Sequence, residues 1–216
     1  MELKNIKLYR ITHIENIPHI IINGITHRNS INKNPNFLNI GDTALIDYRN
    51  TKEIIINNGI NNEFNKIILG DFIPFYFGIK MPMLYVIQSG GNFVEKPIAK
   101  EEIIYLVISL EEIMKSTDNF YFSDGHATDT STVFYDKKFV NKLPQIIDWD
   151  AVKSNYWGNQ ENLILKRKKQ AEFLSSNDIN PNFIVGYGCY NNSAKEKLIS
   201  FGINETTIKV IPNAYF

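Results

Sequence analysis

Hydrophobic and polar residues alternate in patterns that predict short strands and short helices from the start of the chain. Residues 8–12 alternate as a strand does, and residues 17–22 follow the helical period, with Pro18 in the first turn and Gly24 just past the last. A polar turn at residues 13–16 joins the two. Because backbone N–H groups are free at the start of a helix, this corner is expected to hold an anionic or amide-bearing ligand.

The same patterns predict a mixture of elements in the rest of the chain. Residues 29–41 are expected to form a loop and residues 51–58 a short helix closed by Gly59, whereas residues 161–169 fit a helix or an extended segment. Asp148 and Ser193 are expected to cap two later helices. The predicted strands are residues 83–87, 103–110, 120–123, 183–190 and 208–211. Elements mixed without regular alternation favour an α+β fold, which we expect to form a single domain over residues 1–216.

Composition and charge narrow the class of protein. The chain has 216 residues, 44% of them hydrophobic and 21% charged, as in a folded globular protein. Its 23 basic and 23 acidic side chains cancel, so any contact with nucleic acid must be local. No apolar run is long enough to cross a membrane, no signal-type segment opens the chain, and Cys189 is the single cysteine. We therefore expect a cytoplasmic protein without disulfides.

Several kinds of chemistry lack the residues they need. The four histidines form no His-x-x-x-His pair, and one cysteine cannot build a zinc site, so no metal is expected. Residues 186–188, Gly-Tyr-Gly, lie inside a predicted strand. They indicate a bulge or a close backbone approach rather than a dinucleotide-binding fingerprint.

One carboxylate stands out by its position. Glu172 lies between the four cations of residues 166–169 and the apolar pair Phe173 and Leu174. A carboxylate at such a boundary is partly desolvated yet reachable, which suits a group that hydrogen-bonds a substrate hydroxyl or takes a proton. The alternative interpretation is a surface glutamate paired with Lys168 or Lys169.

Aromatic residues gather in residues 72–77, close to Pro74 and Gly78. Such a cluster is typical of a packed corner of the core. A flat slot between rings is also what a planar heterocyclic ligand needs, and both interpretations stay open at this point.

Five segments taken together resemble the DarT family, bacterial toxins that ADP-ribosylate DNA with NAD. They are residues 9–17, residues 71–78 running on to 82–87, residues 123–127, residues 166–174 and residues 210–216. They occur in the order found in the family and span nearly the whole chain. The resemblance implies an ADP-ribosyltransferase-like fold, with two small mixed sheets around an NAD cleft and flanking helices. It also implies an antitoxin partner that carries an ADP-ribose-removing macrodomain.

The resemblance assigns roles to individual residues. It implies that Glu172 and Arg49 are catalytic, with Arg49 also holding the NAD pyrophosphate by a forked contact. When the bond between nicotinamide and ribose breaks, positive charge develops on the sugar, and a carboxylate such as Glu172 stabilises it. The alternative for one of the NAD-binding residues, His13, is a histidine satisfied within its own turn. The expected NAD-binding residues are Thr12, His13, Asn16, Arg49, Tyr76 and Phe77.

The acceptor implied by the resemblance is single-stranded DNA, because an enzyme that reacts at a base nitrogen must first free it from pairing. Thymine is the default base. Guanine in DNA, an RNA or protein acceptor, and a binding module without enzymatic activity are the alternatives. Met83 could line a base pocket, although a place in the core is the simpler interpretation. The expected nucleic-acid contacts are Met83, His126, Lys166, Arg167 and Lys169.

Overall fold

The computed structural model describes residues 2–57, 65–90, 94, 96–117 and 119–216. The strands are β1 Lys7–His13, β2 Glu53–Asn57, β3 Asn65–Ile68, β4 Ile73–Tyr76, β5 Ile103–Ser109, β6 Phe120–Ser123, β7 Phe134–Asp136, β8 Glu172–Ser175, β9 Ile184–Cys189 and β10 Ile208–Val210. The α-helices are α1 Ile17–Asn23, α2 Thr43–Thr51, α3 Pro82–Ser89, α4 Leu110–Ser116, α5 Leu143–Ile146, α6 Trp149–Lys153, α7 Leu163–Lys169 and α8 Asn192–Ser200. Short 3-10 turns join many of them.

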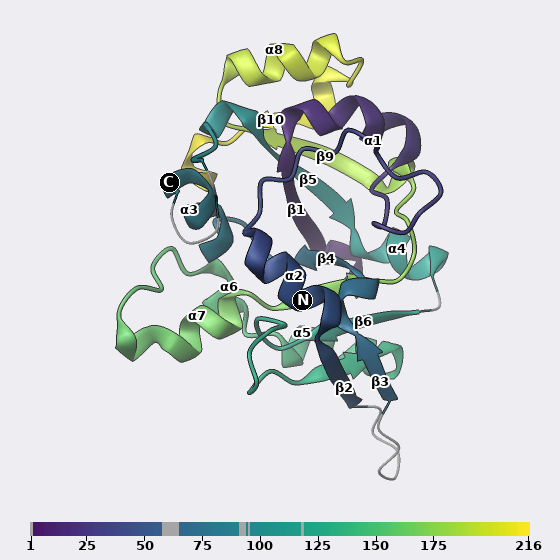
Figure 1. The fold of residues 1–216 in the computed structure, drawn as a ribbon, viewed down its shortest axis with the longest axis vertical. Coiled ribbons are helices and arrows are strands. Elements are labelled where there is room, and N and C mark those ends of the chain that lie inside the picture. The colour runs from purple at the N-terminus through teal and green to yellow at the C-terminus, as the bar shows by residue number, and fades with distance from the viewer. Residues whose placement is uncertain (1, 58–64, 91–93, 95, 118) are drawn as a thin grey trace.

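The strands form one mixed sheet in the order β10-β9-β5-β1-β4-β8-β6-β7-β2-β3. Two neighbouring pairs, β10 with β9 and β2 with β7, are parallel, and the other pairs are antiparallel. The helices α1 and α8 lie near one end of the sheet, and α5, α6 and α7 gather near the other (Figure 1). The α+β class predicted from the sequence is confirmed.

The predicted division into two small sheets is wrong, because the strands form one continuous sheet. The sheet is nevertheless weakly joined between β1 and β4. Strand β1 pairs with β5 over seven residues, but it meets β4 at a single register pair, Tyr9 with Tyr76. Beyond this pair the two strands part, and Pro74 in β4 has no N–H with which to extend the ladder. The sheet is therefore continuous but nearly split at its centre.

Two expected elements in the middle of the chain have another form. A helix is expected at residues 51–58, but helix α2 already ends at Thr51 and residues 53–57 form strand β2. Gly59, expected to close that helix, lies outside the described residues. The buried side chains of Ile54 and Ile56 alternate with exposed Ile55, which is the period of a strand. Three consecutive isoleucines, taken alone, do not distinguish the period of a strand from that of a helix.

The strand expected at residues 83–87 is helix α3. Pro82 occupies its first turn and Gly90 ends it with a positive φ of 68°. Leu84 and Ile87 are buried against Ile103, Tyr105 and the C-terminal segment, so the apolar run buries a helical face rather than alternate strand positions.

Most other expected elements are confirmed, with shifts at their ends. Residues 161–169, left open between helix and extended chain, contain helix α7. Asp148 caps α6 by accepting a hydrogen bond from the Ala151 N–H, although the helix stops at Lys153. The cap of α8 is Asn191 rather than Ser193. Within the described ranges, no helix is long and apolar enough to span a membrane.

Candidate active site

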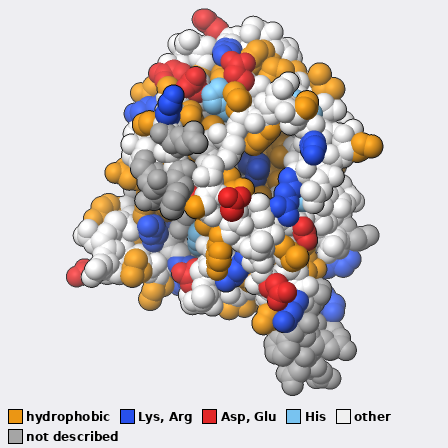
Figure 2. Space-filling view, viewed as in Figure 1, with side chains coloured by type: hydrophobic (Ala, Val, Ile, Leu, Met, Phe, Trp, Pro, Cys, Tyr) orange, Lys and Arg blue, Asp and Glu red, His pale blue; other side chains and the backbone are white. Residues whose placement is uncertain are grey.

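A cavity of about 580 Å³ lies where β1 and β4 part, a volume usual for small-molecule sites. Its wall combines β1, β4, the start of β8, helix α2 and the loop of residues 33–42. Figure 2 shows this face hollowed, with basic side chains in and around the hollow. The cavity thus joins segments from both halves of the nearly split sheet.

Glu172 stands at the first position of β8, opposite Tyr76 in the register. Its side chain is only 1% exposed, yet it forms part of the cavity wall. Both carboxylate oxygens accept hydrogen bonds from Arg49, at 3.1 and 2.7 Å, and Oε1 accepts a third from the Ala127 N–H at 3.1 Å. Glu172 is thus less exposed than a boundary position suggests, and it pairs with Arg49 rather than with Lys168 or Lys169.

The electrostatics of this pair keep the carboxylate ionised. Burial alone would raise the pKa of Glu172, but the charge and hydrogen bonds of Arg49 lower that pKa below its ordinary value. Glu172 in turn raises the pKa of Arg49 against the effect of burial. An ionised carboxylate in a partly enclosed cavity can stabilise positive charge that develops on a bound ligand.

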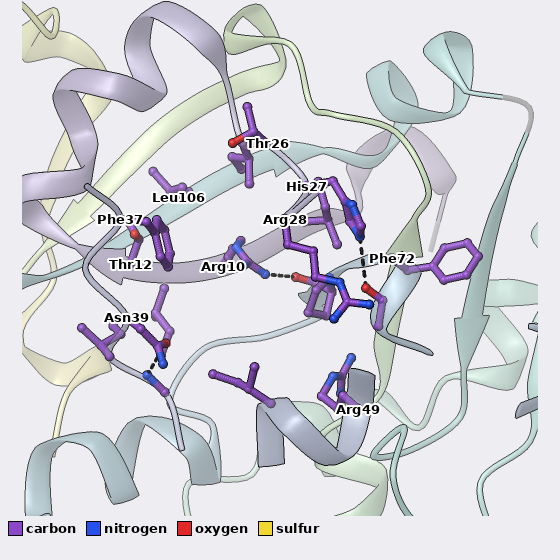
Figure 3. Close-up of a pocket in the computed structure, with 18 of the residues that line it drawn as sticks. Arg10, Thr12, Thr26, His27, Arg28, Phe37, Asn39, Arg49, Phe72 and Leu106 are labelled. Carbon is purple, nitrogen blue, oxygen red and sulfur yellow. Dashed lines mark hydrogen bonds between the residues drawn. The ribbon is translucent and has the colours of Figure 1, made fainter. Parts of the chain in front are cut away.

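Arg49 reaches Glu172 from the last turn of α2. This helix forms because Asp42 caps it, accepting from the Leu45 N–H at 2.9 Å. The helix places the Arg49 guanidinium over the cavity, where the side chain is 13% exposed (Figure 3). A forked pair between residues 123 apart in sequence joins α2 to β8.

Thr12 and Asn16 have different places in the structure. Thr12 is buried in β1 and lines the cavity. Asn16 is fully buried behind it: its amide donates to Thr12 Oγ1 and to the Leu38 carbonyl, and its oxygen accepts from the Leu38 N–H. Asn16 therefore fixes the loop whose residues Phe37 and Asn39 line the cavity.

His13 is not among the residues that line the cavity. Its Nδ1 accepts a hydrogen bond from the Glu15 N–H at 3.1 Å, and its Nε2 lies 3.8 Å from the Glu102 carboxylate. This is the arrangement of a histidine satisfied within its turn. A direct contact between His13 and NAD remains a prediction.

The two aromatic candidates separate clearly. Tyr76 lines the cavity beside Glu172, and burial together with the nearby carboxylate raises the pKa of its hydroxyl. Phe77 is buried in the core, edge to face with Trp149 at 5.9 Å between ring centroids. The cavity therefore offers the Tyr76 ring to a planar ligand, and Phe77 supports the strand from behind.

Of the expected DNA contacts, Met83 lines the cavity from α3. His126 lies in the loop that binds Glu172 through Ala127, with its Nδ1 2.9 Å from Thr128 Oγ1. Burial lowers the pKa of His126, so it is mostly neutral at pH 7.

The basic run at the end of α7 is largely occupied within the protein. Arg167 donates to Asp124 at 2.9 Å, and Lys168 pairs with Asp148 at the same distance. Lys169 is 1% exposed and donates to the carbonyls of Val152 and Ile79. Lys166 is the most exposed of the four, so it is the best placed of them to meet a DNA phosphate.

Arg10 is a cavity residue that the sequence did not single out. It lies two residues before Thr12 on β1, and its guanidinium projects into the cavity (Figure 3). Its position two residues before Thr12, on the same face of the strand, is a signal that could have indicated it. Arg28 and Lys33 add further positive charge to the wall. Among the described residues, no group of three or more acidic, histidine or cysteine side chains could hold a metal ion.

The fold and the cavity define a class: an α+β enzyme whose ligand cavity is lined by cations and by one ionised glutamate. The chain belongs to the DarT family, since the family described as "ssDNA thymidine ADP-ribosyltransferase, DarT" matches residues 9–216. A DNA ADP-ribosyl transferase of Escherichia coli O127:H6 is 32% identical over 193 residues, which cover 88% of this chain and 83% of the relative.

Other matches come from Thermus sp. 2.9 and Thermosipho africanus. The structure of Thermus sp. 2.9 DarT in complex with ADP-ribosylated ssDNA superposes with a TM-score of 0.80 at 26% identity, covering 97% of this chain and 96% of that one. The same Thermus protein has been solved in complex with NAD+, at a TM-score of 0.74 and 25% identity. A DNA ADP-ribosyl transferase-DNA ADP-ribosyl glycohydrolase fusion protein of Thermosipho africanus is 28% identical over 97% of this chain, which spans 49% of the fusion.

Proposed function

We propose that this chain uses NAD to transfer ADP-ribose to thymine in single-stranded DNA, with nicotinamide as the leaving group. The observation that carries the proposal is the buried Glu172–Arg49 pair on the wall of a cationic cavity, in a chain of the DarT family. The volume of the cavity and the positive charge of its wall suit a dinucleotide with a dianionic pyrophosphate. Residues 1–216 act as one domain, and the reaction takes place in the cytoplasm.

Glu172 has the central role in the reaction. The bond between the nicotinamide nitrogen and the ribose carbon breaks, and nicotinamide leaves with the electron pair. Glu172, kept ionised by Arg49, stabilises the positive charge on the sugar. The bond from that carbon to a ring nitrogen of the base then forms, and the base releases its proton.

Arg49 links ligand binding to the protonation of Glu172. While both guanidinium donors bind Glu172, the low pKa makes this carboxylate a weak base. A pyrophosphate that attracts Arg49 would weaken the pair and raise the pKa of Glu172. The carboxylate could then accept the proton that the base nitrogen loses.

The remaining residues bind and orient the substrates. Thr12 and Tyr76 contact NAD in the cavity, and Asn16 holds the loop over it. Met83 lies where the base approaches, and Lys166 binds DNA phosphate. The fused glycohydrolase of the Thermosipho relative supports a partner for this chain that removes ADP-ribose from DNA, as an antitoxin of a toxin–antitoxin pair does.

Mass spectrometry of oligonucleotides tests the proposal. We expect a single-stranded oligonucleotide of mixed sequence to gain one ADP-ribose on thymine when protein and NAD are added. RNA, a cell lysate and an oligonucleotide with guanine but no thymine serve as parallel acceptors. Labelling confined to one of these would overturn the assignment of the acceptor.

Variants test the catalytic assignment. Replacing Glu172 by glutamine keeps the size of the side chain but removes its charge, and we expect a loss of about 10³-fold in rate. Glu205→Gln is the matched control, because Glu205 is an exposed glutamate that pairs with Lys195 outside the cavity. Equal rates for Glu172→Gln and the control would remove Glu172 from the mechanism.

A further inference from the structure

Arg10 is a partly buried cation of the cavity wall with few hydrogen-bond partners. Its Nη1 donates to the Pro74 carbonyl at 2.8 Å (Figure 3). A guanidinium carries five N–H donors, and no other hydrogen-bond acceptor is recorded for Arg10 within the described residues. The remaining donors therefore face the cavity that this side chain lines.

The contact with Pro74 follows from the split in the sheet. Strands β1 and β4 share only the pair Tyr9 and Tyr76, so the carbonyl of Pro74 lies where the strands have begun to part. Arg10 bridges this gap with one N–H. The bridge explains why the side chain lies across the cavity wall, but it leaves the positive charge without a counter-charge.

The other cavity arginines differ in this respect. Arg49 is neutralised by Glu172, and Arg28 lies 3.6 Å from Asp71 at the rim. No carboxylate lies within ion-pair distance of Arg10 among the described residues. Burial, with the nearby charge of Arg49, lowers the pKa of Arg10 to about 10. A half-buried cation with a like charge beside it is stabilised by an anion from outside the protein.

We propose that Arg10 is an oxyanion-binding residue of the cavity and that the group it binds is the pyrophosphate of the dinucleotide. Arg10 and Arg49 present two guanidinium groups to one ligand, and Glu172 neutralises only that of Arg49. A guanidinium matches two phosphate oxygens at once. The identity of the anion rests on the proposed function, whereas the oxyanion site rests on the partners of Arg10 alone.

Binding of inorganic pyrophosphate and of ADP-ribose tests the site without any transfer reaction. By titration calorimetry we expect Arg10→Gln to weaken both ligands at least tenfold and to leave adenosine, which has no phosphate, unchanged. Arg10→Lys keeps the charge but loses the fork, so its affinity for both should be intermediate. Lys7→Gln is the matched control, because Lys7 is a cation of the same strand that does not line the cavity.

A second measurement uses the unaltered protein, in case Arg10→Gln fails to fold. Phenylglyoxal modifies accessible guanidinium groups, and peptide mass spectrometry reports each arginine separately. We expect pyrophosphate to protect Arg10 and to leave Arg28 at the rim open to modification.

The outcomes separate a binding role from a purely structural one. If Arg10 only bridges to Pro74, Arg10→Gln lowers the melting temperature but binds pyrophosphate as tightly as the control, and pyrophosphate protects no arginine; this overturns the proposal. Absence of labelled DNA with the unaltered protein would contradict the proposed function instead. Pyrophosphate binding would still decide the role of Arg10.

Discussion

Two regions meet at Glu172, and their arginines behave differently. On the side of the loop of residues 124–132, Arg167 donates to Asp124 and to Thr132, and it lies so close to Gly125 that a Cβ there would come within 2.4 Å of Nη1. On the side of the cavity, Arg10 has one carbonyl partner among the described residues, and the rest of its guanidinium faces the cavity. Both are arginines near a catalytic candidate. An arginine that stabilises the fold and one that is free to bind a ligand therefore differ in the number of their hydrogen-bond partners, and not in their distance from Glu172.

Glu172 belongs to both regions. From the loop side it receives the Ala127 N–H, and its own N–H donates to Ser123 Oγ at 3.1 Å. From the cavity side it receives Arg49. The loop side fixes the carboxylate in place, and the cavity side offers the one partner that a ligand can compete for.

The largest expected effect comes from breaking the pair on the cavity side. Arg49→Met leaves Glu172 buried without its counter-charge, so we expect a loss of about 3–5 kcal/mol in the free energy of unfolding, measured with urea. The rate of DNA labelling should fall about 10²- to 10³-fold.

The double variant with Arg49→Met and Glu172→Met sharpens this result. It removes both charges, so most of the stability should return while labelling stays absent. A double variant as unstable as Arg49→Met would show that packing of the arginine, and not the lone carboxylate, accounts for the loss.

A smaller effect is expected on the loop side. Arg167→Met leaves the partly buried Asp124 unpaired and should cost about 2–4 kcal/mol of stability, while the dissociation constant for ADP-ribose stays within about twofold. Lys166→Met, one residue earlier and exposed, should change stability by less than about 0.5 kcal/mol.

The variants Arg167→Met and Lys166→Met also distinguish a structural role from a role in DNA binding. Lys166→Met should weaken a single-stranded oligonucleotide and reduce the slope of log affinity against log salt by about 0.7. If Arg167→Met changed the salt slope more than Lys166→Met does, Arg167 rather than Lys166 would be the residue that binds DNA phosphate.

A further expected effect, smaller than those of Arg49→Met and Arg167→Met, is the pH dependence that Lys169 contributes to stability. Burial, with the nearby charge of Lys80, lowers the pKa of Lys169 to about 8. Between this value and the ordinary pKa of 10.5 the unfolded chain binds more protons than the folded one, so Lys169 makes stability rise with pH in this window. Relative to Lys169→Met, the unaltered protein should gain about 1–3 kcal/mol from pH 8 to pH 10.5, measured by urea unfolding. An equal pH dependence of both proteins would mean that Lys169 keeps its ordinary pKa in the fold.

Much of the fold could be predicted where one period dominates. The strand of residues 8–12 and the helix of residues 17–22 are confirmed as β1 and α1, and Gly24 closes the helix with a φ of 77°. The prediction failed at residues 51–58 and 83–87, where short apolar runs fit the period of a strand as well as that of a helix. In such runs the residues that pack against them determine which element forms. In the candidate site, the sequence indicated Glu172, Thr12 and Tyr76, and all three line the cavity.

The sequence by itself determined the family, through five segments in a fixed order, and it pointed to Glu172, the acid to which we assign the chemistry. Only the tertiary structure decided which charges are free. Lys169 and Arg167 belong to a run that looks solvated, yet both donate to acceptors elsewhere in the chain. Arg10 in strand β1 has a single acceptor among the residues that the structure describes. Hydrogen-bond partners come from residues far apart in sequence, so a local pattern can show that a charge exists but not whether the fold already satisfies it.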